Sequence, residues 1–123
     1  MPIVDIEVVT NPSETVAGKE QLQSLADELG DLFSSGPGDT WIRLRSIDRR
    51  GYAENRTLVD GRVRPTFVSV LRYELPDAAE LRREMAGIAE AVARILRRPR
   101  ENVHVLYSPG AKGRIGFGGK LEE

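Results

Sequence analysis

The chain has 123 residues, of which 40% are hydrophobic and 30% are charged, and its formal net charge is −1. These values fit one soluble globular domain and exclude a multidomain machine or a disordered tail. A nearly neutral chain has no global field to hold it on nucleic acid or on an anionic membrane, so neither is an expected partner. With no cysteine and a single histidine, His104, Cys-based metal centres and two-histidine motifs are excluded, and no metal is expected.

The sequence also lacks the features of membrane insertion and secretion. No apolar run approaches the roughly 18–20 residues that span a bilayer. The N-terminus lacks the basic start and apolar stretch of a secretion signal. We therefore expect a cytoplasmic protein.

The first half of the chain predicts a strand, a helix and a strand. Residues 3–9 alternate between two faces, with Val4, Ile6 and Val8 on one of them, which indicates a strand. Apolar residues then recur at spacings of three and four over residues 22–33, which predicts a helix that the glycines and proline at 36–38 end. Residues 40–47 alternate again and predict the second strand.

The second half repeats this order. Residues 66–73 predict a strand that Pro65 leads, and Asp77 with Glu80 forms an acidic variant of the capping box. An apolar stripe over residues 81–96 predicts a helix that Pro99 stops. Residues 102–107 predict the fourth strand, and the glycine-rich tail at 110–119 indicates a turning hairpin that docks on a neighbour.

Two β-α-β units in one chain predict an α+β fold. We expect a single domain over residues 1–123, with units at 2–58 and 65–123, whose four strands form one sheet with both helices on one face. The other face is too apolar for water, so oligomerisation is expected to cover it. Its apolar residues are Ile3, Val9, Trp41, Ile47, Phe67 and Leu71, with Val103 or Leu106.

The N-terminal pair Met1-Pro2 offers a catalytic group. A small penultimate residue favours removal of the initiator methionine, so we expect the mature chain to begin with Pro2. Burial of its secondary amine beside cationic groups would lower the amine pKa toward working pH, which suits a base for carbon acids. Taken alone, Met-Pro is also explained by efficient processing without any catalytic role.

Further residues carry a family resemblance. The opening Pro-Ile-Val-Asp-Ile-Glu-Val-Val, the β-α-β length, and the tail Asn-Val-His-Val-Leu-Tyr followed by Ala-Lys-Gly-Arg-Ile-Gly-Phe-Gly-Gly resemble the 4-oxalocrotonate tautomerase family. The chain is similar to a fused, two-unit member of the tautomerase superfamily, with the size of the macrophage migration inhibitory factor (MIF) branch. The resemblance implies a homotrimer and a cofactor-independent site in which Pro2 acts on α-keto acids or enols, as a general base or, in hydrating relatives, as a general acid.

The resemblance also implies substrate-binding residues. The family's second-strand arginine falls on Arg43 in the first unit and on His104 in the second. The family's aromatic residue in the C-terminal hairpin falls on Ile115, with Phe117 two positions later.

Two other family positions also differ in this sequence. The family's arginine after the first strand is absent near Pro12, and Arg72 or Arg64 could replace it. The nitrogen of Pro65 lies in a peptide bond, so one active site per chain is expected.

The central stretch adds independent support for an anionic ligand. Residues 43–72 contain eight arginines and three acids, and guanidinium groups bind carboxylates bidentately. Solvated loops or intersubunit salt bridges would also explain these arginines. In the same stretch, Tyr52 or Asn55 could donate to an enolate oxygen and Glu54 could activate water, although loop polarity explains them about as well.

We therefore predict a homotrimeric isomerase of the tautomerase fold. Pro2 would move a proton on a small keto/enol carboxylic acid, Arg43 would bind the carboxylate, and the arginine-rich loop and the C-terminal hairpin would complete the pocket. One alternative is a hydratase, dehalogenase or decarboxylase that uses protonated Pro2. The other is a non-catalytic tautomerase-fold protein that binds a ligand or partner.

Overall fold

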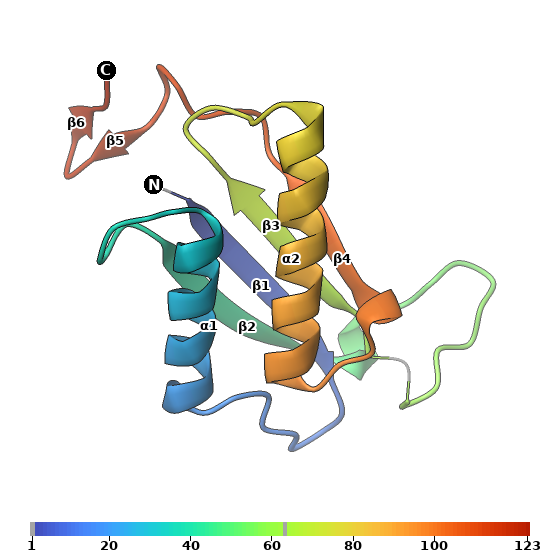
Figure 1. The fold of residues 1–123 in the computed structure, drawn as a ribbon. Helices are drawn as coiled ribbons and strands as arrows, with labels where there is room; N and C mark the ends of the chain where they lie inside the picture. The colour runs from blue at the N-terminus through green and yellow to red at the C-terminus, as the bar shows by residue number, and fades with distance from the viewer. Residues whose placement is uncertain (1, 63) are drawn as a thin grey trace.

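A computed structural model describes residues 2–62 and 64–123 of the chain. Four strands form one mixed sheet in the order β2-β1-β3-β4, and both long helices cover the same face of it (Figure 1). This arrangement confirms the predicted α+β fold. The strands are β1 (Ile3–Thr10), β2 (Trp41–Asp48), β3 (Thr66–Leu71), β4 (Val103–Tyr107), β5 (Gly116–Phe117) and β6 (Lys120–Leu121), the helices are α1 (Lys19–Leu32) and α2 (Ala78–Leu96), and the short 3₁₀ helices are η1 (Arg49–Gly51) and η2 (Arg100–Asn102).

The two β-α-β units lie side by side in the sheet and run in opposite directions. Within each unit a helix connects two parallel strands, β1 with β2 and β3 with β4, as parallel pairing requires. The two units meet along β1 and β3, which are antiparallel, with Ile3 opposite Leu71 and Val8 opposite Thr66. Pro2 and Pro65 therefore lie at opposite ends of the sheet.

The core lies between the sheet and the helices. Alternating residues of β1 and β3 point toward the helices and are almost fully buried, as the strand pattern predicts. The helices contribute residues at spacings of three and four from their inner stripes. The principal members of this core are Val4, Ile6, Val8, Leu25, Leu29, Val68, Val70, Ile88 and Val92.

The helix ends depend on capping residues more than on the predicted breakers. The Asp77 side chain accepts a hydrogen bond from the Glu80 amide at 2.9 Å, which confirms the predicted N-cap of α2. That helix ends at Leu96 because Arg97 takes a left-handed conformation with φ of 56°, two residues before Pro99. Likewise, α1 ends at Leu32, ahead of the glycines at 36 and 38.

The face of the sheet away from the helices is partly apolar and partly open. Trp41 is 49% exposed and Leu106 is 68% exposed, whereas Val103 belongs to the core, so Leu106 is the residue that β4 adds to the open face. Val9 differs from the expectation, because it is fully buried within the single chain. None of the helices in the described part of the chain is long and apolar enough to cross a membrane.

The glycine-rich tail forms the predicted hairpin. Strands β5 and β6 pair with Gly116 opposite Leu121, and Gly118 and Gly119 make the turn with φ of 59° and 84°. Positive φ at two consecutive residues is the geometry of a tight two-residue hairpin turn, which glycine adopts without strain. In Figure 1 this hairpin lies at the same end of the molecule as the N-terminus.

Candidate functional site

Pro2 occupies a buried position at the end of the sheet where β1 begins. Its carbonyl accepts a hydrogen bond from the Trp41 amide at 3.0 Å, which fixes it beside the start of β2. One step beyond the Ile3–Leu71 pair, the antiparallel register sets Pro2 opposite Arg72. Met1, whose removal the sequence predicts, lies outside the described residues.

Arg72 belongs to a buried polar cluster on the helix side of the sheet. Its Nη1 bonds to the carboxylate of Glu84, and the Tyr107 hydroxyl donates to the same carboxylate at 2.7 Å. The Arg72 guanidinium also lies 5.3 Å from the centre of the Phe33 ring, within cation–π distance. The cluster thus joins the end of β3 to α1, α2 and β4.

The environment of Glu84 explains the cluster's stability. Glu84 is only 1% exposed, and an unpaired carboxylate at such a position would be costly. The Arg72 guanidinium and the Tyr107 hydroxyl offset this cost by bonding to the Glu84 carboxylate. Burial, together with the bond to Glu84, raises the pKa of Tyr107 far above its usual range, so the phenol stays a hydrogen-bond donor at physiological pH. The Arg72 side chain remains 24% exposed, and its fork has further N–H donors for an anion near Pro2.

Arg43 lies on the other face of the sheet. Its guanidinium makes a bidentate ion pair with Asp5 at 2.5 Å and 2.8 Å, and the pKa of Asp5 is lowered chiefly by this hydrogen bonding. Asp5 is three residues beyond Pro2, about 10 Å along the strand. Within one chain, the structure does not bring Arg43 and Pro2 together.

Tyr52, Asn55 and His104 gather at the end of the sheet remote from Pro2. The rings of Tyr52 and His104 lie 5.9 Å and 5.7 Å from the ring of Phe67, which β3 places on the open face. The Tyr52 hydroxyl donates to Glu54 at 2.6 Å, and this bond is the main cause of the raised pKa of Tyr52. Asn55 lies exposed in the same loop.

The C-terminal hairpin reaches the Pro2 end instead. The Phe117 ring packs edge-on against Trp41 with 5.6 Å between ring centres, and the two line a hollow of about 250 Å³ together with Gly38 and Asp39. Ile115 lies half-buried at the base of the hairpin, where its carbonyl accepts the Glu122 amide at 2.9 Å. Trp41 was expected only as an interface residue, although its position at the start of the second strand was a signal that it would lie beside Pro2.

The arginine-rich stretch is largely neutralised by acids of the same chain. Five of its eight arginines have carboxylate partners, and three of those acids lie outside the stretch itself. Arg64 is at the Pro65 end of the sheet, remote from Pro2. The pairs are Arg43–Asp5, Arg50–Asp48, Arg62–Asp60, Arg64–Glu14 and Arg72–Glu84.

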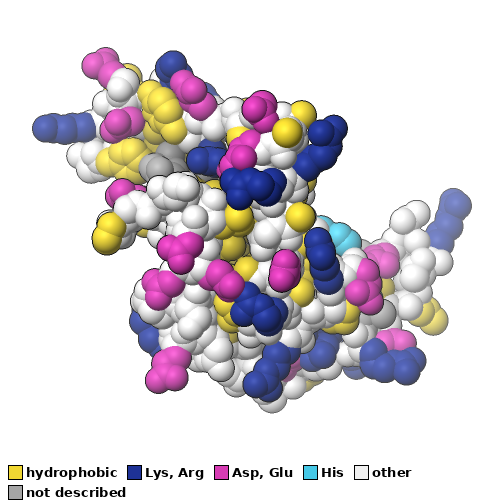
Figure 2. Space-filling model, viewed as in Figure 1, with side chains coloured by type: hydrophobic (Ala, Val, Ile, Leu, Met, Phe, Trp, Pro, Cys, Tyr) yellow, Lys and Arg dark blue, Asp and Glu magenta, His cyan; other side chains and the backbone are white. Residues whose placement is uncertain are grey.

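Charges elsewhere on the surface are mixed. On the face drawn in Figure 2, acidic and basic side chains alternate and form no large patch of one sign. The described residues contain no cluster of acidic or histidine side chains arranged to hold a metal ion.

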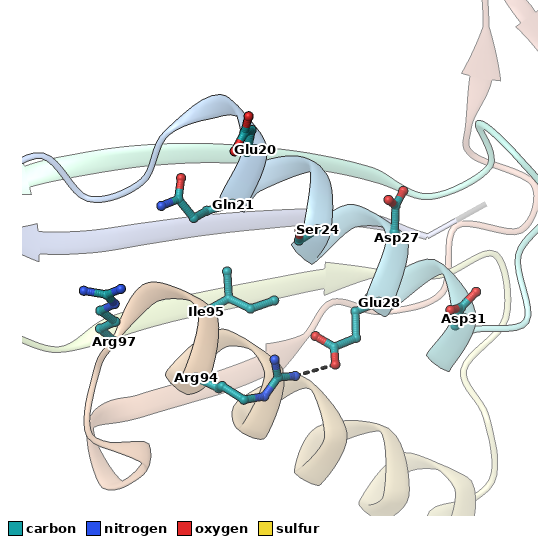
Figure 3. A pocket seen from close by; sticks show the side chains of 9 residues that line it. All are labelled: Glu20, Gln21, Ser24, Asp27, Glu28, Asp31, Arg94, Ile95 and Arg97. Atoms are coloured by element: carbon teal, nitrogen blue, oxygen red, sulfur yellow. Dashed lines mark hydrogen bonds and ion pairs between the residues drawn. The ribbon is translucent and has the colours of Figure 1, made fainter.

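Another hollow is remote from Pro2. It measures about 680 Å³ and lies between α1 and α2, where Arg94 bonds to Glu28 (Figure 3). Four carboxylates line it, so it is poorly suited to a carboxylate ligand. These are Glu20, Asp27, Glu28 and Asp31.

Comparison with known proteins identifies the fold. No protein-family model matches the chain, and no curated protein sequence matches it. The solved structure of MIF from Oncomelania hupensis matches with a TM-score of 0.75 at 15% identity, over 100% of this chain and 83% of that chain. The wild-type asymmetric trimer of a fused 4-OT matches with a TM-score of 0.73 at 18% identity, over 95% and 94%.

A third solved structure has the same fold. A malonate semialdehyde decarboxylase inhibited by 3-bromopropiolate matches with a TM-score of 0.67 at 19% identity, over 94% of this chain and 88% of that chain. At these identities the likeness concerns the fold. The chain has the fold of the tautomerase/MIF superfamily, over nearly its whole length.

Proposed function

We propose that this protein is an enzyme of the tautomerase superfamily that moves a proton on a small keto/enol carboxylic acid, with Pro2 as the acid–base residue after loss of Met1. The register that sets buried Pro2 opposite Arg72 is the observation that carries this proposal. A cation close to a buried amine disfavours its protonated form and so lowers the amine pKa toward neutrality. A base with such a pKa suits the abstraction of a proton from carbon.

The chemistry requires only groups of the protein. The Pro2 nitrogen would take a proton from the carbon next to the keto group, leaving an enolate, and would return it to another carbon of the conjugated system or to the enolate oxygen. The remaining N–H donors of Arg72 would bind the carboxylate or the developing enolate charge, which is the kind of stabilisation that acts most strongly in the transition state. Trp41 and Phe117 would exclude water from the substrate's apolar part.

The open face of the sheet supports a homotrimer. Trp41 and Leu106 are exposed large apolar residues on that face, and the fused 4-OT of the same fold is a trimer. Arg43, Tyr52, Asn55 and His104 would then serve a site shared with a neighbouring chain. Ile115 and Phe117 would close the pocket from the hairpin.

A test of this function begins with the mature N-terminus. Intact mass of the protein from its native host should match a chain without Met1. Turnover of phenylenolpyruvate and of 2-hydroxymuconate should then fall about 10²–10⁴-fold in Pro2→Ala. Pro65→Ala is the matched control, because the nitrogen of Pro65 is an amide, and we expect its turnover to stay close to that of the native protein. Equal rates for the native protein and Pro2→Ala would contradict the proposal.

The pKa of the Pro2 nitrogen, measured by nitrogen NMR, separates the two roles of the proline. A pKa below the assay pH supports the base of a tautomerase. A pKa well above it supports a proton donor, as a hydratase or a decarboxylase would need. A retained Met1 would make this nitrogen an amide and leave only a binding function.

A further inference from the structure

A second charged cluster lies at the Pro65 end of the sheet. Glu14, from the segment before α1, accepts hydrogen bonds from Arg64 at 2.6 Å and from Arg98 at 2.9 Å. These partners are 50 and 84 residues away in the sequence. The Arg98 side chain is only 2% exposed, while those of Arg64 and Glu14 are 29% and 21% exposed.

The charges of this cluster do not balance. Two guanidinium groups share one carboxylate, so the cluster keeps one positive charge in a largely buried place, which is costly unless an anion compensates it. Burial opposes ionisation of Glu14, but the Asn11 amide and the two arginines outweigh it and hold the pKa of Glu14 below its usual value. The carboxylate is therefore already charged at neutral pH and cannot offset the second guanidinium.

Donors of both arginines are also unfilled. The Nε atoms of Arg64 and Arg98 are buried and have no hydrogen-bond partner among the described residues. Buried polar groups in folded proteins are nearly always bonded, and charged donors cost most when they are not. Because protein atoms enclose these Nε atoms, an anion from outside the chain would offset the missing acceptors by binding the exposed part of the Arg64 guanidinium.

The structure provides space for such an acceptor. A hollow of about 340 Å³ is lined by Glu14, Arg64, Arg98, Gln21 and Arg97, among others. It lies between the first turn of α1 and the last turn of α2. The partial positive charge of the one helix end and the partial negative charge of the other offset each other. The charge of the hollow is therefore set by its three arginines and one acid. Figure 3 shows Gln21 and Arg97 together at one end of the groove between the helices, away from the Arg94–Glu28 pair.

We propose that this hollow, the Pro65-end site, binds the anionic oxygens of a small molecule bearing a carboxylate or a phosphate group. Arg98 and Arg64 would hold these oxygens from inside, and Arg97 would attract them at the rim. Guanidinium forks match both planar carboxylates and tetrahedral phosphates. The site is at the opposite end of the sheet from Pro2, and it does not depend on the proposed function.

Replacement of the Glu14 carboxylate tests this proposal, because it should change the affinity for anions in the direction opposite to replacement of an arginine. Glu14 competes with a bound anion for guanidinium N–H groups, so Glu14→Gln should strengthen anion binding. A cluster that served only to stabilise the fold would lose stability in Glu14→Gln without any gain in anion binding. Replacement of an arginine has the opposite effect on binding and should weaken it.

The experiment is calorimetric titration of the full chain with inorganic phosphate and, separately, with acetate, at constant ionic strength. We expect saturable binding of at least one anion, strengthened about ten-fold or more in Glu14→Gln and weakened about two- to five-fold in Arg97→Asn. Asparagine is chosen because Arg97 has a φ of 56°, which asparagine tolerates. Arg100→Asn removes a nearby exposed arginine outside the hollow and is the matched control.

Each outcome decides the proposal. Binding of phosphate alone or acetate alone supports it and identifies the class of anion. Absence of saturable binding by both anions, unchanged affinity in Glu14→Gln, or equal weakening in Arg97→Asn and Arg100→Asn would overturn it. Arg98→Gln should abolish binding, but because Arg98 is buried its loss could prevent folding, so the exposed Arg97 and the partly exposed Glu14 carry the test.

Discussion

The two ends of the sheet each hold a cluster of glutamate and arginine side chains, but only one of the two clusters has equal numbers of positive and negative charges. At the Pro2 end, buried Glu84 meets one arginine, Arg72, and the hydroxyl of Tyr107. At the Pro65 end, Glu14 meets two arginines, Arg64 and Arg98. A balanced pair has no excess charge to draw an ion into the core and holds Arg72 in place beside Pro2. The unbalanced cluster leaves a cation that an outside anion can compensate.

The largest expected effect is on the balanced pair. Glu84→Ala leaves a partly buried guanidinium and a phenol without their acceptor, so the free energy of unfolding should fall by about 3–5 kcal/mol. Urea denaturation followed by circular dichroism measures it. Glu90→Ala is a useful control, since Glu90 lies exposed on the same helix, away from the Arg72–Glu84 pair. A loss for Glu84→Ala no greater than that of the control would show that the pair has little structural weight.

Arg72 should matter for turnover as well as for stability, because a neutral residue in its place leaves buried Glu84 without its ion-pair partner. Because the register sets Arg72 opposite Pro2, Arg72→Gln should lower kcat/KM for carboxylate substrates about 10- to 100-fold, the value of a charged hydrogen bond. Arg62→Gln, which removes an exposed arginine near the Pro65 end, should leave kcat/KM unchanged. Steady-state kinetics on both variants distinguishes the arginines, and similar losses in both would remove Arg72 from the site.

The unbalanced end should respond less strongly and in a ligand-dependent way. Glu14→Gln should lower the free energy of unfolding by about 1–3 kcal/mol, because Arg98 loses its charged partner. Added phosphate should restore part of this loss and raise the melting temperature of the variant more than that of the native protein. Thermal denaturation with and without phosphate measures both effects. An equal rise of the melting temperature in the two proteins would contradict an anion site at the Pro65 end.

The smallest expected effect is on the stability of the protein at acidic pH. Asp5 has a pKa lowered by Arg43, and a carboxylate whose folded pKa is depressed stabilises the fold above its unfolded pKa and loses that contribution as pH falls through the folded value. Stability should therefore decline from about pH 5 downward, and less steeply in Arg43→Gln. The exposed Arg43 limits the difference to less than about 1 kcal/mol. Denaturation at several pH values tests it, and parallel pH curves would exclude a contribution from the pair.

The local features of the fold were determined by the sequence. Alternation over residues 3–9, the apolar spacing in both helices, Asp77 before α2 and the adjacent Gly118 and Gly119 each encode a local geometry that needs no distant partner. The two β-α-β units also required β1 to run parallel to β2 and β3 parallel to β4, whereas the antiparallel pairing of β1 with β3, which sets the strand order, was decided by tertiary structure.

The pairing of charges was decided by tertiary structure. Counting arginines over residues 43–72 supported an anionic ligand, but Asp5, Glu14 and Glu84, which neutralise three of these arginines, lie outside that stretch. Pro2 and Pro65 each precede the first strand of a unit, but side-chain alternation aligns Thr66 with Val4, so Pro65 is one residue out of step with Pro2. An ion pair depends on which side chains the sheet register and helix packing bring within about 4 Å of each other, and sequence spacing carries no information about that distance.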